Sequence, residues 1–143
     1  MIGLRVQTVF RARAVHDAVA SGQRRYLYRA AGYVRTIARR SIRKAKGKSQ
    51  PGQPPKSHVG RLKQGIRFAV EATKAVIGPI RVWSKHQSSA LPGCALLEKG
   101  GTAIRTHKRG GVRRIRYRPR PFMGPALQTA TPKLPDMWRD AVG

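Results

Sequence analysis

The spacing of apolar side chains changes along the chain, and each spacing predicts a different element. Between residues 13 and 46 these side chains recur three, four or seven positions apart, which predicts an amphipathic helix with one apolar stripe. The stripe consists of Val15, Val19, Tyr26, Ala30, Val34, Ile37 and Ser41. At about 1.5 Å per residue, the helix would measure roughly 50 Å. Ser21-Gly22 leaves open a kink, or a break into two helices.

Alternation at period two predicts short strands before and after this helix. Residues 2–6 alternate in this way near the start of the chain. Residues 47–60 are rich in proline and glycine, so we expect a mobile loop that ends the helix. Alternation then returns and predicts strands at residues 66–70 and 75–82, joined by a turn.

A second group of short elements follows in the C-terminal half. Residues 94–98 are mostly apolar and predict one or two helical turns, which Gly100-Gly101 would stop. Two further alternating runs, residues 102–106 and 112–117, predict a hairpin.

The stretch from Arg118 to Leu127 predicts the start of a closing helix. Prolines on both sides of Arg120 disfavour helical backbone, so the chain should arrive here in an extended conformation. Apolar residues then fall at helical spacings, and Pro132 and Pro135 should interrupt the helix before its second apolar segment. The residues expected to pack are Phe122, Met123, Leu127 and Trp138.

Together these elements predict an α+β fold. The long N-terminal helix would pack on a small, mostly antiparallel β-sheet, with a C-terminal helix closing the structure. A chain of 143 residues fits a single domain, residues 1–143. We expect that domain to carry the mobile basic loop at about 47–60 and a basic hairpin at about 102–120.

The charge of the chain indicates a negatively charged partner. Lys and Arg number 31 against 5 Asp and Glu, for a formal net charge of +26. The cations concentrate in two acid-free runs, whereas solvated surfaces normally mix both signs. We therefore expect salt-sensitive contact with a polyanion or an acidic partner, without recognition of specific bases. The expected contact residues are Arg39, Arg40, Arg43, Lys44, Lys46, Lys48, Arg105, Lys108, Arg109, Arg113, Arg114, Arg116, Arg118 and Arg120.

The sequence offers little for catalysis or metal binding. Asp136 and Asp140 are the one pair of acids at a helical spacing, and we expect both on a solvated face. The four histidines are scattered, and no zinc-type spacing is present. Gly47-Lys48-Ser49 lacks the earlier glycine of a phosphate-binding loop. We therefore expect a protein that is not an enzyme and has no cofactor and no metal.

Cysteine usage and hydropathy bear on the compartment. Cys94 is the single cysteine, which excludes an intramolecular disulfide and suits a reducing environment. No apolar run approaches the roughly 18–20 residues of a membrane span. Residues 1–10 lack the features of a signal peptide. We expect a soluble chain in the cytoplasm, without a membrane partner.

Four short motifs occur in an order that resembles a known family. After the long helix come Ser57–Ile66 (SHVGRLKQGI), Ala75–Ile80 (AVIGPI), Ala95–Thr102 (ALLEKGGT) and Arg120–Leu127 (RPFMGPAL). This order is similar to that of the tail-completion and head–tail joining proteins of tailed bacteriophages, the minor tail protein Z-like or virion morphogenesis group. Val59 stands where that family usually has Thr, and Lys99 where an aromatic residue is common.

The resemblance implies a structural virion protein of the phage neck or upper tail. Such a subunit forms a ring, often hexameric, that joins or completes the tail at the head–tail interface. Its implied partners are further copies of itself, neighbouring neck and tail proteins, and DNA passing through the channel. Two other classes stay open. One is a basic nucleic-acid-binding protein, ribosome-associated or DNA-compacting. The other is an enzyme acting on nucleic acid, which is disfavoured because the chain has very few carboxylates that could bind a metal.

Overall fold

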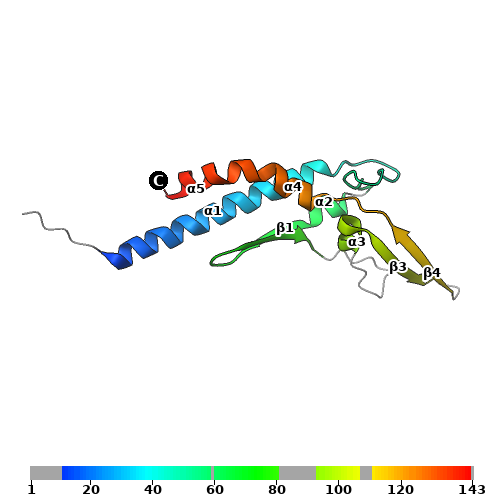
Figure 1. Cartoon of the computed structure of the whole chain (residues 1–143), viewed down its shortest axis with the longest axis horizontal. Coiled ribbons are helices and arrows are strands. Elements are labelled where there is room, and N and C mark those ends of the chain that lie inside the picture. The colour runs from blue at the N-terminus through cyan, green and yellow to red at the C-terminus, as the bar shows by residue number, and fades with distance from the viewer. Residues whose placement is uncertain (1–10, 59, 81–92, 107–110, 143) are drawn as a thin grey trace, which may run out of the picture.

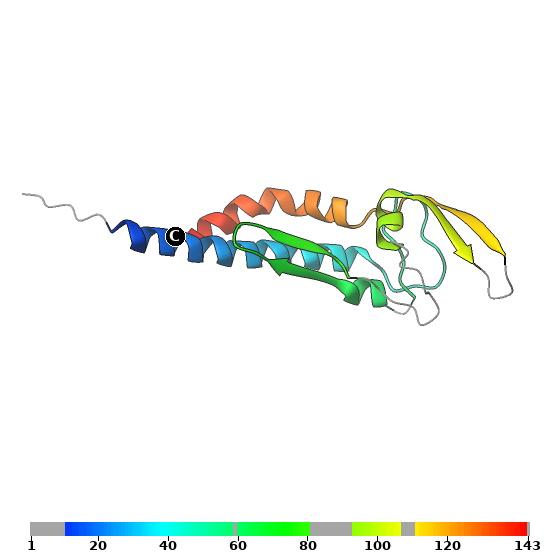
Figure 2. The same cartoon turned by 90° about the horizontal axis from the view of Figure 1, so that it is seen from below.

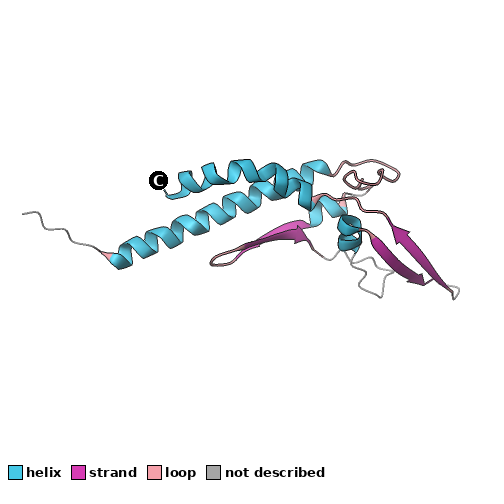
Figure 3. Cartoon of the chain, in the orientation of Figure 1, coloured by secondary structure: helices cyan, strands magenta, loops and turns pink. Residues whose placement is uncertain are grey.

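The computed structural model describes residues 11–58, 60–80, 93–106 and 111–142, which form an elongated α+β arrangement (Figure 1). The helices and strands are distinguished by colour in Figure 3. In chain order the elements are α1 (Ala12–Ser41), α2 (Arg61–Gly65), β1 (Ile66–Val70), β2 (Ala75–Pro79), α3 (Gly93–Lys99), β3 (Gly101–Thr106), β4 (Val112–Tyr117), α4 (Met123–Ala130), a 3-10 turn (Thr131–Lys133) and α5 (Leu134–Val142).

The long helix α1 runs without a break through Ser21-Gly22, so the alternative of two helices is wrong. It ends at Ser41, five residues earlier than the predicted limit of 46. Ile42 has extended backbone, with φ −83° and ψ 108°, and its side chain is fully buried. The change to extended backbone at Ile42 ends the helix and directs this side chain into the core.

The buried stripe of α1 differs from the predicted one. Val15 and Val19 are 49% and 46% exposed, because the first turns of α1 extend beyond the elements that pack on it (Figure 1). Small residues carry the close packing further along, where α4 and β1 approach the helix. The buried residues of α1 are Gly22, Ala31, Val34 and Ala38.

The strands form two separate hairpins instead of one sheet. In the first, β1 pairs antiparallel with β2, from Ile66 opposite Pro79 to Val70 opposite Ala75. In the second, β3 pairs antiparallel with β4, from Gly101 opposite Tyr117 to Thr106 opposite Val112. The β1–β2 hairpin lies along α1, whereas the β3–β4 hairpin extends away from the helices (Figures 1 and 2). The strand predicted at residues 75–82 ends at Pro79, and its last two predicted residues, 81–82, lie outside the described residues, as does the strand predicted at 2–6.

The C-terminal helices return along α1 on the side away from β1–β2 (Figure 1). The prolines at 132 and 135 interrupt the helix as predicted, with a 3-10 turn between α4 and α5. The Trp138 ring meets Tyr26 of α1 edge-on, with ring centroids 5.1 Å apart. The Arg25 guanidinium donates to the Ala141 carbonyl at 3.1 Å. The α+β fold class is confirmed, with α1 packed between the first hairpin and the closing helices.

The hydrophobic core lies where the end of α1 meets β1 and the start of α4. Its buried members are Ala38, Ile42, Ile66, Phe122 and Ala126. Phe122 is fully buried and Met123 packs against this cluster, as predicted. Leu127 is 50% exposed, so its predicted packing role is wrong; Ala126 faces the core in its place. Trp138 is 40% exposed.

Among the described residues, no helix combines the length and the apolar character needed to cross a bilayer.

We predict that Phe122→Ala lowers the free energy of unfolding by about 3–5 kcal/mol, because it leaves a cavity in the core. Leu127→Ala is the matched control on the exposed side of α4 and should cost less than about 1 kcal/mol. Thermal unfolding of both variants measures the difference. Equal shifts in Tm would contradict the assignment of Phe122 to the core.

Candidate anion-binding surface

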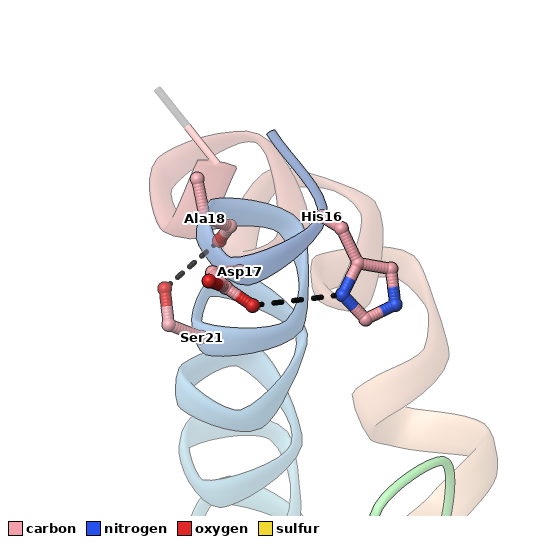
Figure 4. A network of polar contacts seen from close by, with 4 residues as sticks. All are labelled: His16, Asp17, Ala18 and Ser21. Atoms are coloured by element: carbon pink, nitrogen blue, oxygen red, sulfur yellow. Dashed lines mark hydrogen bonds and ion pairs between the residues drawn. The ribbon is translucent and has the colours of Figure 1, made fainter. Parts of the chain in front are cut away.

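The acids and histidines that the structure describes lie mostly at the surface. His16 and Asp17, at the start of α1, approach to 3.7 Å, with side chains 84% and 72% exposed (Figure 4). Asp136 pairs with Arg139 at 3.6 Å, also in solvent. No group of three or more metal-ligating side chains is present within the described ranges. These positions offer neither a desolvated acid–base pair nor a metal cage.

Cys94 in α3 is half-buried. Burial raises the pKa of its thiol above the ordinary value, because the charged thiolate loses hydration. The thiol is therefore a weaker nucleophile than a free cysteine at neutral pH. This environment is typical of a packing residue.

The first basic run crosses the end of α1 and enters the loop of residues 42–60. Arg40 and the four cations that follow it are exposed, and Arg39 is half-buried. The amide of Ser57 donates to the Arg43 carbonyl at 3.0 Å, which closes the loop across its base. The amide of Gly52 donates to the Pro119 carbonyl at 2.9 Å, which joins the loop to the segment after β4. The loop is thus closed at its base and attached to the rest of the chain near its middle.

The second basic run lies on β4 and the extended arm that follows it. Its exposed members are Arg113, Arg114, Arg116 and Arg118. Arg120 is half-buried, and its Nε donates to the Ser49 carbonyl at 2.9 Å. This guanidinium therefore also holds the loop in place. The structure does not describe the side chain of Arg105, and it does not describe Lys108 or Arg109 at all.

The loop and the arm enclose a groove of about 430 Å³, which we call the basic groove. It brings together Lys48 from the first run and three arginines from the second, and it adds Lys56. The remaining predicted cations lie elsewhere on the surface or outside the described residues. The lining residues are Gly47, Lys48, Ser49, Pro55, Lys56, Leu62, Leu97, Ile115, Arg116, Tyr117, Arg118 and Arg120.

One carboxylate positions the arm that forms a wall of this groove. Glu98, in α3, accepts three backbone hydrogen bonds from the start of α4. Its Oε2 lies 2.9 Å from the Phe122 amide and 3.1 Å from the Met123 amide, and its Oε1 lies 2.8 Å from the Gly124 amide. The N-terminus of α4 has no side-chain cap of its own, so Glu98 pairs its free N–H groups and interacts favourably with the helix dipole.

Backbone geometry brings α3 against the arm. The Arg120 amide donates to the Leu97 carbonyl at 2.6 Å. Gly100 ends α3 at φ +75°, and a Cβ there would lie 3.0 Å from Pro119 Cδ and 3.1 Å from the Tyr117 carbonyl oxygen. A side chain at this position would therefore clash as well as strain the backbone. The glycine turn and the Glu98 cap together dock the ALLEKGGT motif onto RPFMGPAL.

Sequence reasoning missed three of these features: the Glu98 cap, Lys56 and Ser49. The absence of Ser, Thr, Asp or Asn at the start of α4 was a signal that its amides need a partner from elsewhere. No comparable signal in the sequence brings Lys56 and Ser49 to the arginines.

Comparison of the chain with protein-family models, curated proteins and solved structures finds no match.

We predict that Glu98→Gln destabilises the chain by about 1–3 kcal/mol, because the amide NH₂ cannot accept a hydrogen bond and leaves an N–H of α4 unpaired. Glu71→Gln is the matched control, since Glu71 pairs with Lys74 at 3.1 Å in solvent. The control should cost less than about 1 kcal/mol. Denaturant unfolding measures both, and a loss no greater than that of the control would contradict the capping role.

Proposed function

We propose that this chain is a structural, non-enzymatic subunit of a phage neck or upper tail. It forms a ring with further copies and joins or completes the tail at the head–tail interface, so its final location is the virion. The order of the four sequence motifs supports this proposal. Their positions also agree with it: SHVGRLKQGI precedes β1, ALLEKGGT ends in a glycine turn, and RPFMGPAL starts α4.

The observation that carries the proposal is that the β3–β4 hairpin pairs with no further strand among the described residues. A two-stranded sheet without further packing is marginally stable in water. On one face of this hairpin Ile104 is 55% exposed and Val112 is 70% exposed. The register puts these two residues on diagonally adjacent positions of that face, because Ile104 pairs with Arg114 and Val112 with Thr106. A neighbouring subunit that covers this face would stabilise the hairpin.

The first hairpin and α1 support the same proposal. Val76 and Ile80 are 57% and 51% exposed, and Val15 and Val19 at the start of α1 are about half exposed. These apolar groups lie on separate elements of an elongated chain (Figures 1 and 2). These side chains are available for contact with neighbouring copies in a ring.

A net charge of +26 on each copy opposes self-association. Salt screens part of this repulsion, and negative charge on acidic neck and tail proteins or on the DNA in the channel would stabilise a ring further. Both sources are compatible with the exposed arginines and lysines at the end of α1 and along β4.

The second candidate function is a basic nucleic-acid-binding protein that acts as a monomer. The observation in its favour is the basic groove, whose lining contains five cations and no acid.

Light scattering coupled to size exclusion, together with a salt-titrated DNA-binding assay, separates the two functions. We expect a discrete oligomer larger than a dimer, with weak DNA binding at physiological salt. A monomer that binds DNA tightly, with a steep dependence on salt, would overturn the proposed function.

We predict that replacing Arg39, Arg40, Arg43 and Lys44 by Ser impairs assembly and leaves the fold intact, because three of the four are exposed. A control variant removes four exposed cations elsewhere: Arg13, Arg61, Arg67 and Lys99. Circular dichroism checks the fold, and light scattering measures the oligomer. An assembled first variant, or equal loss in both, would contradict a specific role for this run.

A further inference from the structure

We propose that the basic groove binds a phosphate group, carried either by a nucleic-acid strand or by a free phosphate anion. The groove gathers Lys48, Lys56, Arg116, Arg118 and Arg120 around a volume of about 430 Å³. Its described lining contains no carboxylate that could neutralise them. Within the described residues, no side-chain hydrogen bond or ion pair engages Lys48, Lys56 or Arg118, so these cations are available to a ligand.

A buried hydroxyl in the same lining points to a specific ligand. Ser49 is only 6% exposed, and its Oγ has no hydrogen-bond partner within the described structure. Buried hydroxyls are normally paired, because an unpaired one has lost its water without replacement. The carbonyl of the same residue is held by Arg120 Nε at 2.9 Å. The residue is thus held beside the cations through its carbonyl, and its hydroxyl is left without a partner.

A phosphate matches this set of groups better than a single carboxylate does. It offers several strong acceptor oxygens, which can take hydrogen bonds from a hydroxyl, an ammonium and a guanidinium together. Arginine also recognises phosphate through two parallel N–H donors, and three of the five cations are arginines.

The rest of the lining is apolar or aromatic, and its members are Pro55, Leu62, Leu97, Ile115 and Tyr117. Aromatic side chains beside a basic groove stack on unpaired bases. A volume of about 430 Å³ falls within the range of small-ligand sites, which suits one nucleotide and not a duplex. A single-stranded phosphodiester would therefore contact the cations with its phosphate and the apolar and aromatic lining with its base.

Backbone hydrogen bonds hold the loop and the arm, the two walls of the groove, in place without a ligand. Gly52 and Pro119 join loop to arm through a 2.9 Å backbone bond, and Arg120 joins the arm to Leu97 at 2.6 Å. The donors are side chains, not the amides of a helix N-terminus, which agrees with the absence of a phosphate-binding loop motif. Phosphate binding by the groove does not depend on assembly into a ring.

The test uses the full chain with two probes, inorganic phosphate followed by calorimetry and a labelled short oligothymidylate followed by anisotropy. The groove variant is Lys56→Ala with Arg118→Ala. The control variant is Arg13→Ala with Arg67→Ala, which removes the same charge from exposed sites on α1 and β1. At about 0.15 M salt, we expect the groove variant to bind at least about tenfold more weakly, and the control within about twofold of the parent chain.

Two further readouts make the test specific. The slope of log affinity against log salt for the oligothymidylate should fall by about 1.4 in the groove variant, since each contact with a single strand contributes about 0.7. Ser49→Ala should weaken binding about threefold and leave the stability of the free chain unchanged or higher, because the hydroxyl has no bond to lose.

The outcomes separate the two sources of phosphate. Groove-dependent binding of the oligothymidylate alone assigns the site to a phosphodiester strand, and groove-dependent binding of inorganic phosphate alone assigns it to the free anion. Loss of both shows that the phosphate group itself is recognised. Equal losses in the groove and control variants, or unchanged affinity in Ser49→Ala, would overturn the proposal.

Discussion

The carboxylate of Glu98 joins α3 and the adjacent β3–β4 hairpin to the helices that pack around the core. Three amides at the start of α4 converge on it, and they would otherwise lie unpaired beside the buried ring of Phe122. Glu98 belongs to α3, at the base of the β3–β4 hairpin, whereas α4 packs on α1. Together with the backbone bond from the Arg120 amide to the Leu97 carbonyl, this contact joins the hairpin and the basic arm to α4.

This arrangement separates packing from charge. The core lies between α1, β1 and α4, and the C-terminal helices that close it carry few charges. The second hairpin and the 42–60 loop carry dense positive charge and leave apolar side chains such as Ile104 and Val112 exposed. In the proposed assembly, the hairpins would contact neighbouring chains and the cations would meet phosphate or acidic surfaces.

Local signals were sufficient to predict most of the elements. Alternation identified β1 and both strands of the second hairpin, and prolines marked the interruption after α4. The stripe of α1 was predicted correctly at Val34, which is buried, and at Ile37, which packs against the core. It was wrong at Val15 and Val19, which are exposed, and it missed the buried Ala31 and Ala38. The site was only partly predictable. The Glu98 cap joins residues 24 to 26 positions apart, and the bond between Arg120 and Ser49 spans 71 positions. Periodicity and turn chemistry give no information over such long separations in the sequence.

The Glu98 contact is tested most directly by hydrogen exchange at the three amides it accepts. First-turn amides of a helix without a cap exchange as fast as those of an open chain, because no carbonyl of the helix pairs with them. Residue-resolved exchange in the parent chain should instead show protection at Phe122, Met123 and Gly124, and Glu98→Ala should abolish it. Open-chain exchange rates at these amides in the parent chain would contradict the account.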